Sequence, residues 1–116
     1  MAEPFVANVR SHDGAAILDL RGEINLFAEQ AMNAAYTQAA QLNAKTILLN
    51  FRDVTYINST GIALVVGLMA QARKSGRKLL ATGLSDHYQE IFKITRLADF
   101  MTIYADEERA LSEVRN

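Results

Sequence analysis

The sequence contains no cysteine and no apolar stretch long enough to cross a bilayer. Without cysteine the chain has no disulfide, no Cys-based zinc site and no thiol nucleophile, which fits a reducing compartment. Its longest apolar run, residues 62–70, is much shorter than the roughly 20 residues of a transmembrane helix. Residues 1–4 lack the basic start and apolar block of a signal peptide. We therefore expect a soluble cytoplasmic protein with no membrane span.

A surplus of positive charge is also missing. Lys and Arg number 12 against 13 Asp and Glu, the net charge is −1, and the basic residues are scattered. Nucleic-acid-binding proteins usually show clustered positive charge, so we expect no direct contact with nucleic acid.

The sequence also lacks the usual signatures of catalysis. His12 and His87 are far apart and neither stands at a metal-ligand spacing, which is typical of surface histidines. There is no Gly-rich phosphate loop, His-Glu-x-x-His or Gly-x-Ser-x-Gly. We expect no catalytic residues, no metal and no cofactor, and therefore a protein that is not an enzyme.

Half of the residues are hydrophobic, enough for one core, so residues 1–116 are expected to form a single domain. Hydrophobic patterning predicts strands at 5–10, 15–20, 46–51 and 78–82, an edge strand at 101–104, and a hairpin turn at 11–14. It predicts helices over residues 28–42, 59–74, 86–95 and from Asp106 onward, with Leu42, Ile91 and Ile94 among their inward-facing residues. This order predicts an α/β fold with a mixed sheet of four to five strands and about four helices, packed mainly on one side.

The junction at residues 53–62 joins the most strand-like run of the chain to its most apolar helix. It contains Asn58, Ser59 and Thr60, small polar residues that can cap a helix by accepting hydrogen bonds from its free N–H groups. The positive end of the helix dipole also favours an anion at such a corner. Ser59 is therefore either a helix N-cap, the commonest role of Ser in this position, or a phosphorylation site. For Thr60 we expect a structural role with its methyl group packed.

The helix that follows has an unusual outer side. At about 100° per residue, one quadrant holds small and mostly uncharged residues flanked by Leu64 and Val66. Its members are Ser59, Ala63, Gly67, Ala70 and Lys74. A solvated face would normally carry Glu, Lys or Gln, so this stripe is consistent with a docking surface. It is equally consistent with a helix face packed under another element of the same domain.

Three segments resemble the anti-sigma factor antagonists of the STAS domain family, which is named for sulfate transporters and these antagonists. Residues 22–25 read Gly-Glu-Ile-Asn where the family has Gly-Glu-Ile/Leu-Asp, and residues 50–54 read Asn-Phe-Arg-Asp-Val after an apolar strand. Residues 57–62 read Ile-Asn-Ser-Thr-Gly-Ile, similar to the family's Asp-Ser-Ser/Thr-Gly-Leu/Ile. Asn25 and Asn58 depart from the family's Asp, which predicts altered kinase recognition. Length and element order match along essentially the whole chain, which implies a STAS-like fold.

The resemblance implies a switch. In the family, a partner that is both serine kinase and anti-sigma factor phosphorylates the first hydroxyl residue of the motif, here Ser59, and a serine phosphatase restores it. The unphosphorylated form docks on the kinase and releases a sigma factor. The partner-binding residues expected from this are Asn58, Ser59, Thr60, Ala63, Val66, Gly67, Ala70 and Lys74.

Two other functions fit part of the sequence pattern. A STAS scaffold or accessory subunit could dock constitutively in a signalling or transport assembly. A phosphoaspartate receiver would use Asp53 after the central strand, but the sequence lacks the acidic pair after its first strand and the Lys after its last. The expected function is therefore that of an anti-sigma factor antagonist, with the constitutive scaffold as the alternative.

Overall fold

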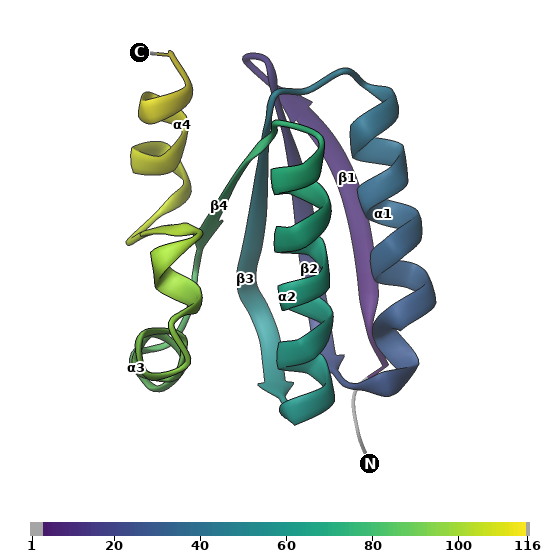
Figure 1. The fold of residues 1–116 in the computed structure, drawn as a ribbon, viewed down its shortest axis with the longest axis vertical. Helices are drawn as coiled ribbons and strands as arrows, with labels where there is room; N and C mark the ends of the chain where they lie inside the picture. Colours follow the sequence, from purple (N-terminus) through teal and green to yellow (C-terminus); the bar gives the residue numbers. More distant parts are fainter. Residues whose placement is uncertain (1–3, 116) are drawn as a thin grey trace.

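A five-stranded mixed sheet forms the centre of the fold. In the computed structural model, which describes residues 4–115, the spatial order of the strands is β1-β2-β3-β4-β5 (Figure 1). The strands are β1 (Val6–His12), β2 (Ala15–Ile24), β3 (Thr46–Ile57), β4 (Lys78–Thr82) and β5 (Thr102–Tyr104). β1 is antiparallel to β2, and the remaining pairs are parallel. This confirms the predicted mixed sheet.

The predicted hairpin joins β1 to β2. Its two turn residues, Asp13 and Gly14, have φ angles of 50° and 85°. Positive φ at both central residues defines the type I′ turn, whose twist matches that of the flanking strands, and Asp-Gly is one of its preferred dipeptides. The local sequence therefore sets the register that pairs His12 with Ala15 and Val6 with Arg21.

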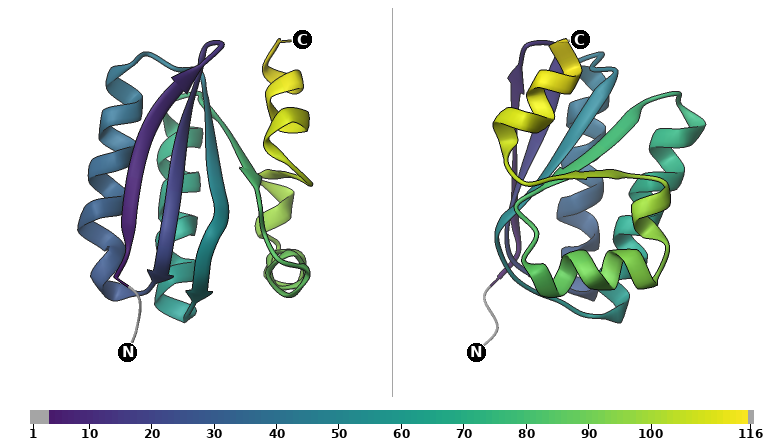
Figure 2. Two further views of the ribbon diagram at one scale, coloured as in Figure 1. Left: turned by 180° about the vertical axis from the view of Figure 1, so that it is seen from behind. Right: turned by 90° about the vertical axis from the view of Figure 1, so that its left-hand side faces the viewer.

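Helices cover both faces of the sheet unequally. They are α1 (Glu29–Gln41), α2 (Ser59–Lys74), α3 (Asp86–Ile94) and α4 (Glu107–Arg115), with short 3₁₀ helices η1 (Leu26–Ala28) and η2 (Leu97–Asp99). α1 and α2 lie side by side on one face, whereas α4 lies on the other (Figures 1 and 2). As predicted, an Asp106 carboxylate oxygen caps α4 by accepting from the Arg109 N–H at 2.9 Å.

Two apolar layers therefore sandwich the central strands. In β3, Ile47 and Leu49 face the larger core under α1 and α2, while Leu48 belongs to a smaller cluster under α4 that includes Leu111. Strands buried on both faces read as continuous apolar runs rather than alternating ones. That explains why residues 47–49 are apolar in succession.

The strands β2 and β3 run further than the sequence predicted. They were expected to end at residues 20 and 51, but pairing continues through irregularities to Ile24 opposite Ile57. In these distal halves residues such as Arg21 and Asp53 are exposed, because the cluster under α4 involves only the first halves of the strands. Polar residues on a solvated sheet face interrupt the apolar run without ending the strand.

Two residues predicted to face inward are exposed. Ile94, at the end of α3, is 71% exposed, because it lies about 200° around the helix from the fully buried Phe92. Leu42 is 51% exposed and is the C-cap residue of α1, where helical spacing no longer sets the direction of a side chain. Ile91 is partly buried against the main core, as expected.

An ion network on the sheet connects α4 to β1 and β2. Arg10 Nε donates to Asp19 Oδ2 at 2.6 Å, and the same guanidinium also pairs with Glu107. Hydrogen bonds from Arg10, and from Asn50 Nδ2 at 2.8 Å, lower the pKa of the Asp19 carboxyl, although partial burial opposes them.

The lowered pKa predicts a pH-dependent stability. A carboxyl whose folded pKa lies below its unfolded value of about 3.9 contributes stability that is present above that value and is lost as pH falls through the folded pKa. Because both side chains are partly exposed, the contribution is about 0.2–1 kcal/mol. Urea unfolding between pH 2 and 7 should therefore show a smaller acid-induced loss in Asp19→Asn than in the wild type. Identical pH profiles would show that the network adds nothing measurable.

Candidate functional site

The predicted corner lies where β3 ends and α2 begins. Asn58 is the N-cap of α2: its backbone is extended and its Oδ1 accepts a hydrogen bond from the Gly61 N–H at 2.8 Å. Ser59 is the first helical residue and is exposed. The interpretation of Ser59 as the N-cap was therefore wrong, because its neighbour does the capping. An exposed hydroxyl is left at the positive end of a 16-residue helix.

Close contacts with neighbouring elements fix the position of this corner. The Asn58 N–H donates to the Ile24 carbonyl oxygen of β2 at 3.2 Å, and the Ile57 N–H donates to Tyr88 Oη of α3 at 2.8 Å. Gly61 packs directly on the end of β2: a Cβ atom there would overlap the Ile24 carbonyl oxygen and lie 2.8 Å from its carbon. Ser59 is thus presented by a helix start that is held on two sides.

Both asparagines that replace the family's Asp are helix caps. Asn25 Oδ1 accepts from the Phe27 N–H at 2.9 Å and caps η1, while its Nδ2 donates to Glu23 Oε1 at 3.2 Å. Asn and Asp cap helices about equally well. The two departures therefore preserve the local structure and remove two negative charges from the neighbourhood of Ser59.

The outer side of α2 is open to solvent. Residues of the stripe predicted from helical spacing are all exposed, namely Ser59, Ala63, Gly67, Ala70 and Lys74. Val66 beside them is 43% exposed, and no atom lies within 4 Å of a Cβ built on Gly67. Within residues 4–115, no other element covers this face. We call it, together with Asn58, Thr60 and Val66, the α2 face.

Thr60 does not pack its methyl group as predicted. Gly61 is the residue that faces β2, so Thr60, about 100° around the helix, points outward and is exposed. Asn58, by contrast, is half-buried. All the residues predicted to bind a partner except Asn58 are therefore exposed, and the structure places them along one helix and its cap.

Two exposed apolar residues beside the corner were not predicted from the sequence to belong to the site. Leu26 and Phe27 form most of η1, and Phe27 is 89% exposed. η1 contacts α2 and begins two residues after Ile24, against which Gly61 packs. An Asn cap followed by two large apolar residues could have indicated a projecting turn.

Neither a metal-binding cluster nor a membrane-spanning helix is found among the residues that the structure describes. Across residues 4–115, there is no group of three or more His, Asp or Glu side chains placed to hold a metal ion. Likewise, none of the helices found there has both the length and the apolar character to cross a membrane. His12 and His87 are exposed, as predicted, and lie in different elements.

Comparison with known proteins identifies the family. A profile of the STAS domain matches residues 6–110, so the chain belongs to the STAS domain family. The anti-sigma-B factor antagonist of Bacillus subtilis (strain 168) is 27% identical over 101 residues, which span 87% of this chain and 92% of that protein. The anti-sigma-B factor antagonist of Staphylococcus aureus (strain NCTC 8325 / PS 47) is 29% identical over 82 residues, or 71% of this chain and 76% of that protein.

Solved structures share the fold. The anti-sigma factor antagonist SpoIIAA in its unphosphorylated form superposes with a TM-score of 0.71 at 24% identity, covering 97% of this chain and 99% of that one. The phosphorylated form of the Bacillus protein SpoIIAA gives a TM-score of 0.70, also at 24% identity, over 96% and 99% of the two chains. The STAS-like fold expected from the sequence is therefore confirmed.

Proposed function

We propose that this protein is an anti-sigma factor antagonist switched by phosphorylation of Ser59. The observation that carries the proposal is the exposed Ser59 hydroxyl at the first position of α2, continuous with the exposed, mostly uncharged α2 face. The relatives named as anti-sigma-B factor antagonists and the phosphorylated form of SpoIIAA support it.

In the proposed mechanism, the unphosphorylated α2 face docks on a serine kinase/anti-sigma factor in the cytoplasm, and a sigma factor is released. The kinase then transfers the γ-phosphoryl group of a nucleoside triphosphate to the Ser59 oxygen, and the nucleoside diphosphate and the hydroxyl proton leave. The phosphate weakens the docking, and a serine phosphatase hydrolyses the ester to inorganic phosphate and restores the hydroxyl. The kinase and phosphatase supply the catalytic groups. The antagonist supplies only the acceptor hydroxyl and the surface, and is not itself an enzyme.

The physical basis is a difference between the free and docked states. A phosphate on Ser59 adds about −1.5 to −2 charge. In the free protein it is solvated and lies at a helix N-terminus, which stabilises an anion by roughly 0.3–1 kcal/mol. In the docked state the phosphate would lie in the contact with the kinase and lose its hydration, and burial of an unpaired charge costs several kcal/mol. Phosphorylation therefore opposes docking without opposing folding.

The test is phosphate labelling of the purified protein in cytosolic extract, with Thr60→Ala as matched control. Wild type and Thr60→Ala should be labelled, whereas Ser59→Ala should not. Thr60 is a suitable control because its hydroxyl is also on an exposed residue but lies one position after the proposed acceptor. The labelling kinase, once purified, should bind Ser59→Ala as tightly as wild type. It should bind Ser59→Asp at least about tenfold more weakly. The Asp side chain mimics phosphoserine only in part, because a carboxylate carries about half the charge of a phosphate.

For Ser59→Asp, the free energy of unfolding should rise although its affinity for the kinase falls. Because Asn58 is the cap, Ser59→Ala should change the free energy of unfolding by no more than about 0.5 kcal/mol. Ser59→Asp should be stabilised by roughly 0.3–1 kcal/mol through the helix dipole. Equal kinase affinity for the Ala, Asp and wild-type proteins would reject the switch and favour the constitutively docking STAS scaffold.

A further inference from the structure

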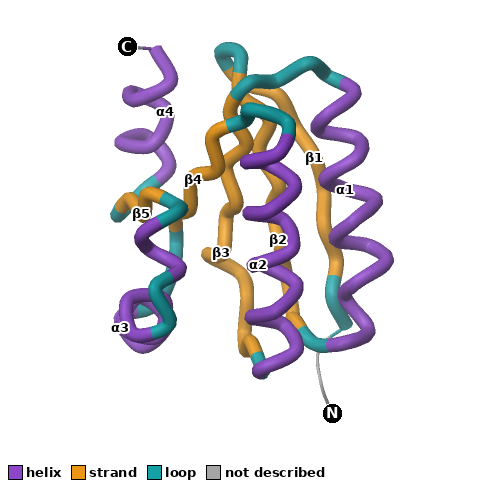
Figure 3. The backbone as a smooth tube through the Cα atoms, viewed as in Figure 1, coloured by secondary structure: helices purple, strands orange, loops and turns teal. Residues whose placement is uncertain are grey.

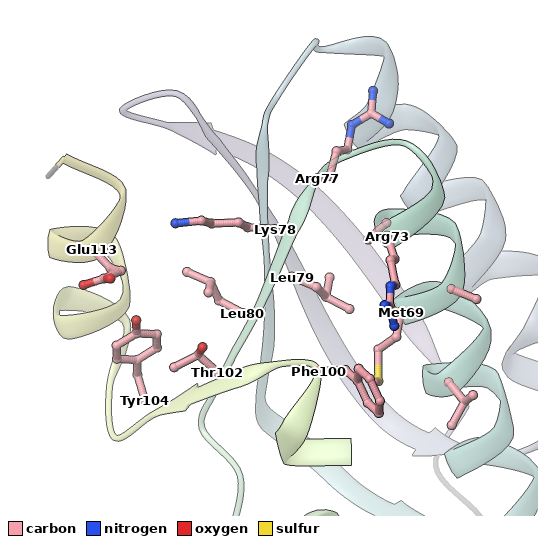
Figure 4. A pocket seen from close by; sticks show the side chains of 13 residues that line it. Met69, Arg73, Arg77, Lys78, Leu79, Leu80, Phe100, Thr102, Tyr104 and Glu113 are labelled. Carbon is pink, nitrogen blue, oxygen red and sulfur yellow. The ribbon is translucent and has the colours of Figure 1, made fainter. Parts of the chain in front are cut away.

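A pocket of about 540 Å³ opens beside the C-terminal half of α2 (Figure 4). It shares Val66 and Ala70 with the α2 face, and the buried Met69 and Leu79 lie at its apolar base. The pocket exists because the edge strand is short: β5 pairs only with residues 80–82 of β4 and leaves the start of β4 without a neighbour on that side (Figure 3). It is therefore a groove at the sheet edge, continuous with the proposed docking surface.

Phe100 and Arg73 form one wall of this groove. Phe100 follows η2 and is 60% exposed, although it is a large apolar residue. The Arg73 guanidinium carbon lies 5.6 Å from the centre of its ring (Figure 4). Arg10 and Arg96 pair with carboxylates, but Arg73 makes no ion pair with any residue in the part of the chain that the structure describes. Exposed aromatic and Arg side chains of this kind are enriched among binding hot spots.

We propose that this groove anchors the same partner that docks on the α2 face, a proposal that rests on the proposed function. An apolar side chain of the serine kinase/anti-sigma factor enters between Val66 and Phe100, and an adjacent carboxylate of that partner pairs with Arg73. Exposed Lys74, next to Arg73 in the sequence, adds positive charge there, which favours an acidic partner segment. Lys78 points to the other side of β4, toward Glu113 on the far wall (Figure 4).

The geometry allows one partner to cover both sites. Ser59 and Arg73 are fourteen residues apart on one helix, or about 21 Å at 1.5 Å per residue. A standard interface of about 800 Å² on each partner is roughly 30 Å across if round. The groove is partly open to solvent and shares Val66 and Ala70 with the α2 face, so a segment of a partner docked on that face can enter it.

The anchor has a consequence for the switch. A phosphate on Ser59 acts within the first turn of α2 and leaves contacts at Phe100 and Arg73 in place. The phosphorylated antagonist then keeps part of its affinity through the groove, so the kinase holds its product weakly rather than releasing it completely.

The test measures affinity for the purified kinase that labels Ser59. Phe100→Ala and Arg73→Glu should each weaken binding at least about tenfold, which corresponds to about 1.4 kcal/mol. Arg52→Glu is the matched charge control, because Arg52 is exposed and follows Phe51, which packs into the core under α2, and Val6→Ala is the apolar control on the far edge strand. Both controls should stay within about twofold of wild type. Residual binding of Ser59→Asp should disappear when Phe100→Ala is added.

The outcomes separate the two proposals. If Ser59 is labelled and Ser59→Asp binds weakly, but Phe100→Ala and Arg73→Glu bind like wild type, the anchor is wrong and the switch stands. If the wild-type protein does not bind the kinase at all, both are wrong. Thermal unfolding checks each variant. Should Phe100→Ala fold poorly, Arg73→Glu decides the question, because Arg73 is an exposed helix residue whose replacement leaves the core unchanged.

Discussion

Replacing Gly61 by alanine should destabilise the protein by about 3 kcal/mol or more, the upper end of what overpacking costs. The added Cβ would overlap the Ile24 carbonyl oxygen and lie 2.8 Å from its carbon and 2.9 Å from Ile57 Cγ2. Two of these three atoms are backbone, so the clash can be relieved only by moving α2 away from the end of β2. Urea unfolding of the purified variant measures the loss.

Gly67 in the same helix is the matched control. No atom lies within 4 Å of a Cβ at that position. Gly67→Ala should therefore stabilise the protein by about 0.5–1 kcal/mol, because alanine is the better helix former and restricts the unfolded chain. Equal stability of Gly61→Ala and wild type would show that α2 does not rest on β2 in the way described, and the fixed presentation of Ser59 would be wrong.

The overall architecture could be predicted because its signals are local. The apolar run at residues 46–51, Asp13-Gly14 after an extended segment, and helical spacing after Ser59 each follow from periodicity or turn chemistry. The two-sided character of α2 was predictable for the same reason: helical spacing alone separates the exposed Ala63 and Gly67 from the buried Val65 and Leu68.

The remaining features depend on contacts between distant segments. Asn58, Ser59 and Thr60 are all plausible caps, and which of them caps is decided by how Gly61 meets Ile24, a contact across 37 residues. The apolar runs of β2 and β3 end before the strands do, because α4 covers only the first halves of these strands. The groove beside Phe100 depends on how little of β4 the edge strand covers: a strand at 101–104 was predicted, but its pairing with residues 80–82 alone was not.

Gly67→Arg is expected to abolish docking on the partner while leaving the fold intact. Gly67 lies on the exposed side of α2 with no neighbouring atoms, so a long side chain can extend into solvent and the free energy of unfolding should stay equal or rise by up to about 1 kcal/mol. In the complex, the same side chain would occupy the centre of the α2 face, two turns from Ser59 and one turn from Ala63. It would separate the surfaces and place an unpaired charge in a desolvated contact, which costs several kcal/mol.

The affinity of Gly67→Arg for the kinase that labels Ser59 should fall at least about a hundredfold, equivalent to about 2.7 kcal/mol. Gly67→Ala controls for the loss of glycine and should bind nearly as wild type, and Gln38→Arg places the same charge at an exposed position of α1. Undiminished binding by Gly67→Arg would place the docking surface elsewhere. A loss of several kcal/mol in its stability would instead mean that α2 is covered in the folded protein, because exposed substitutions typically change stability by only about 0.5 kcal/mol. Full activity of the Gln38→Arg and Gly67→Ala proteins alongside a folded, non-binding Gly67→Arg protein would assign the loss to this one position on the α2 face.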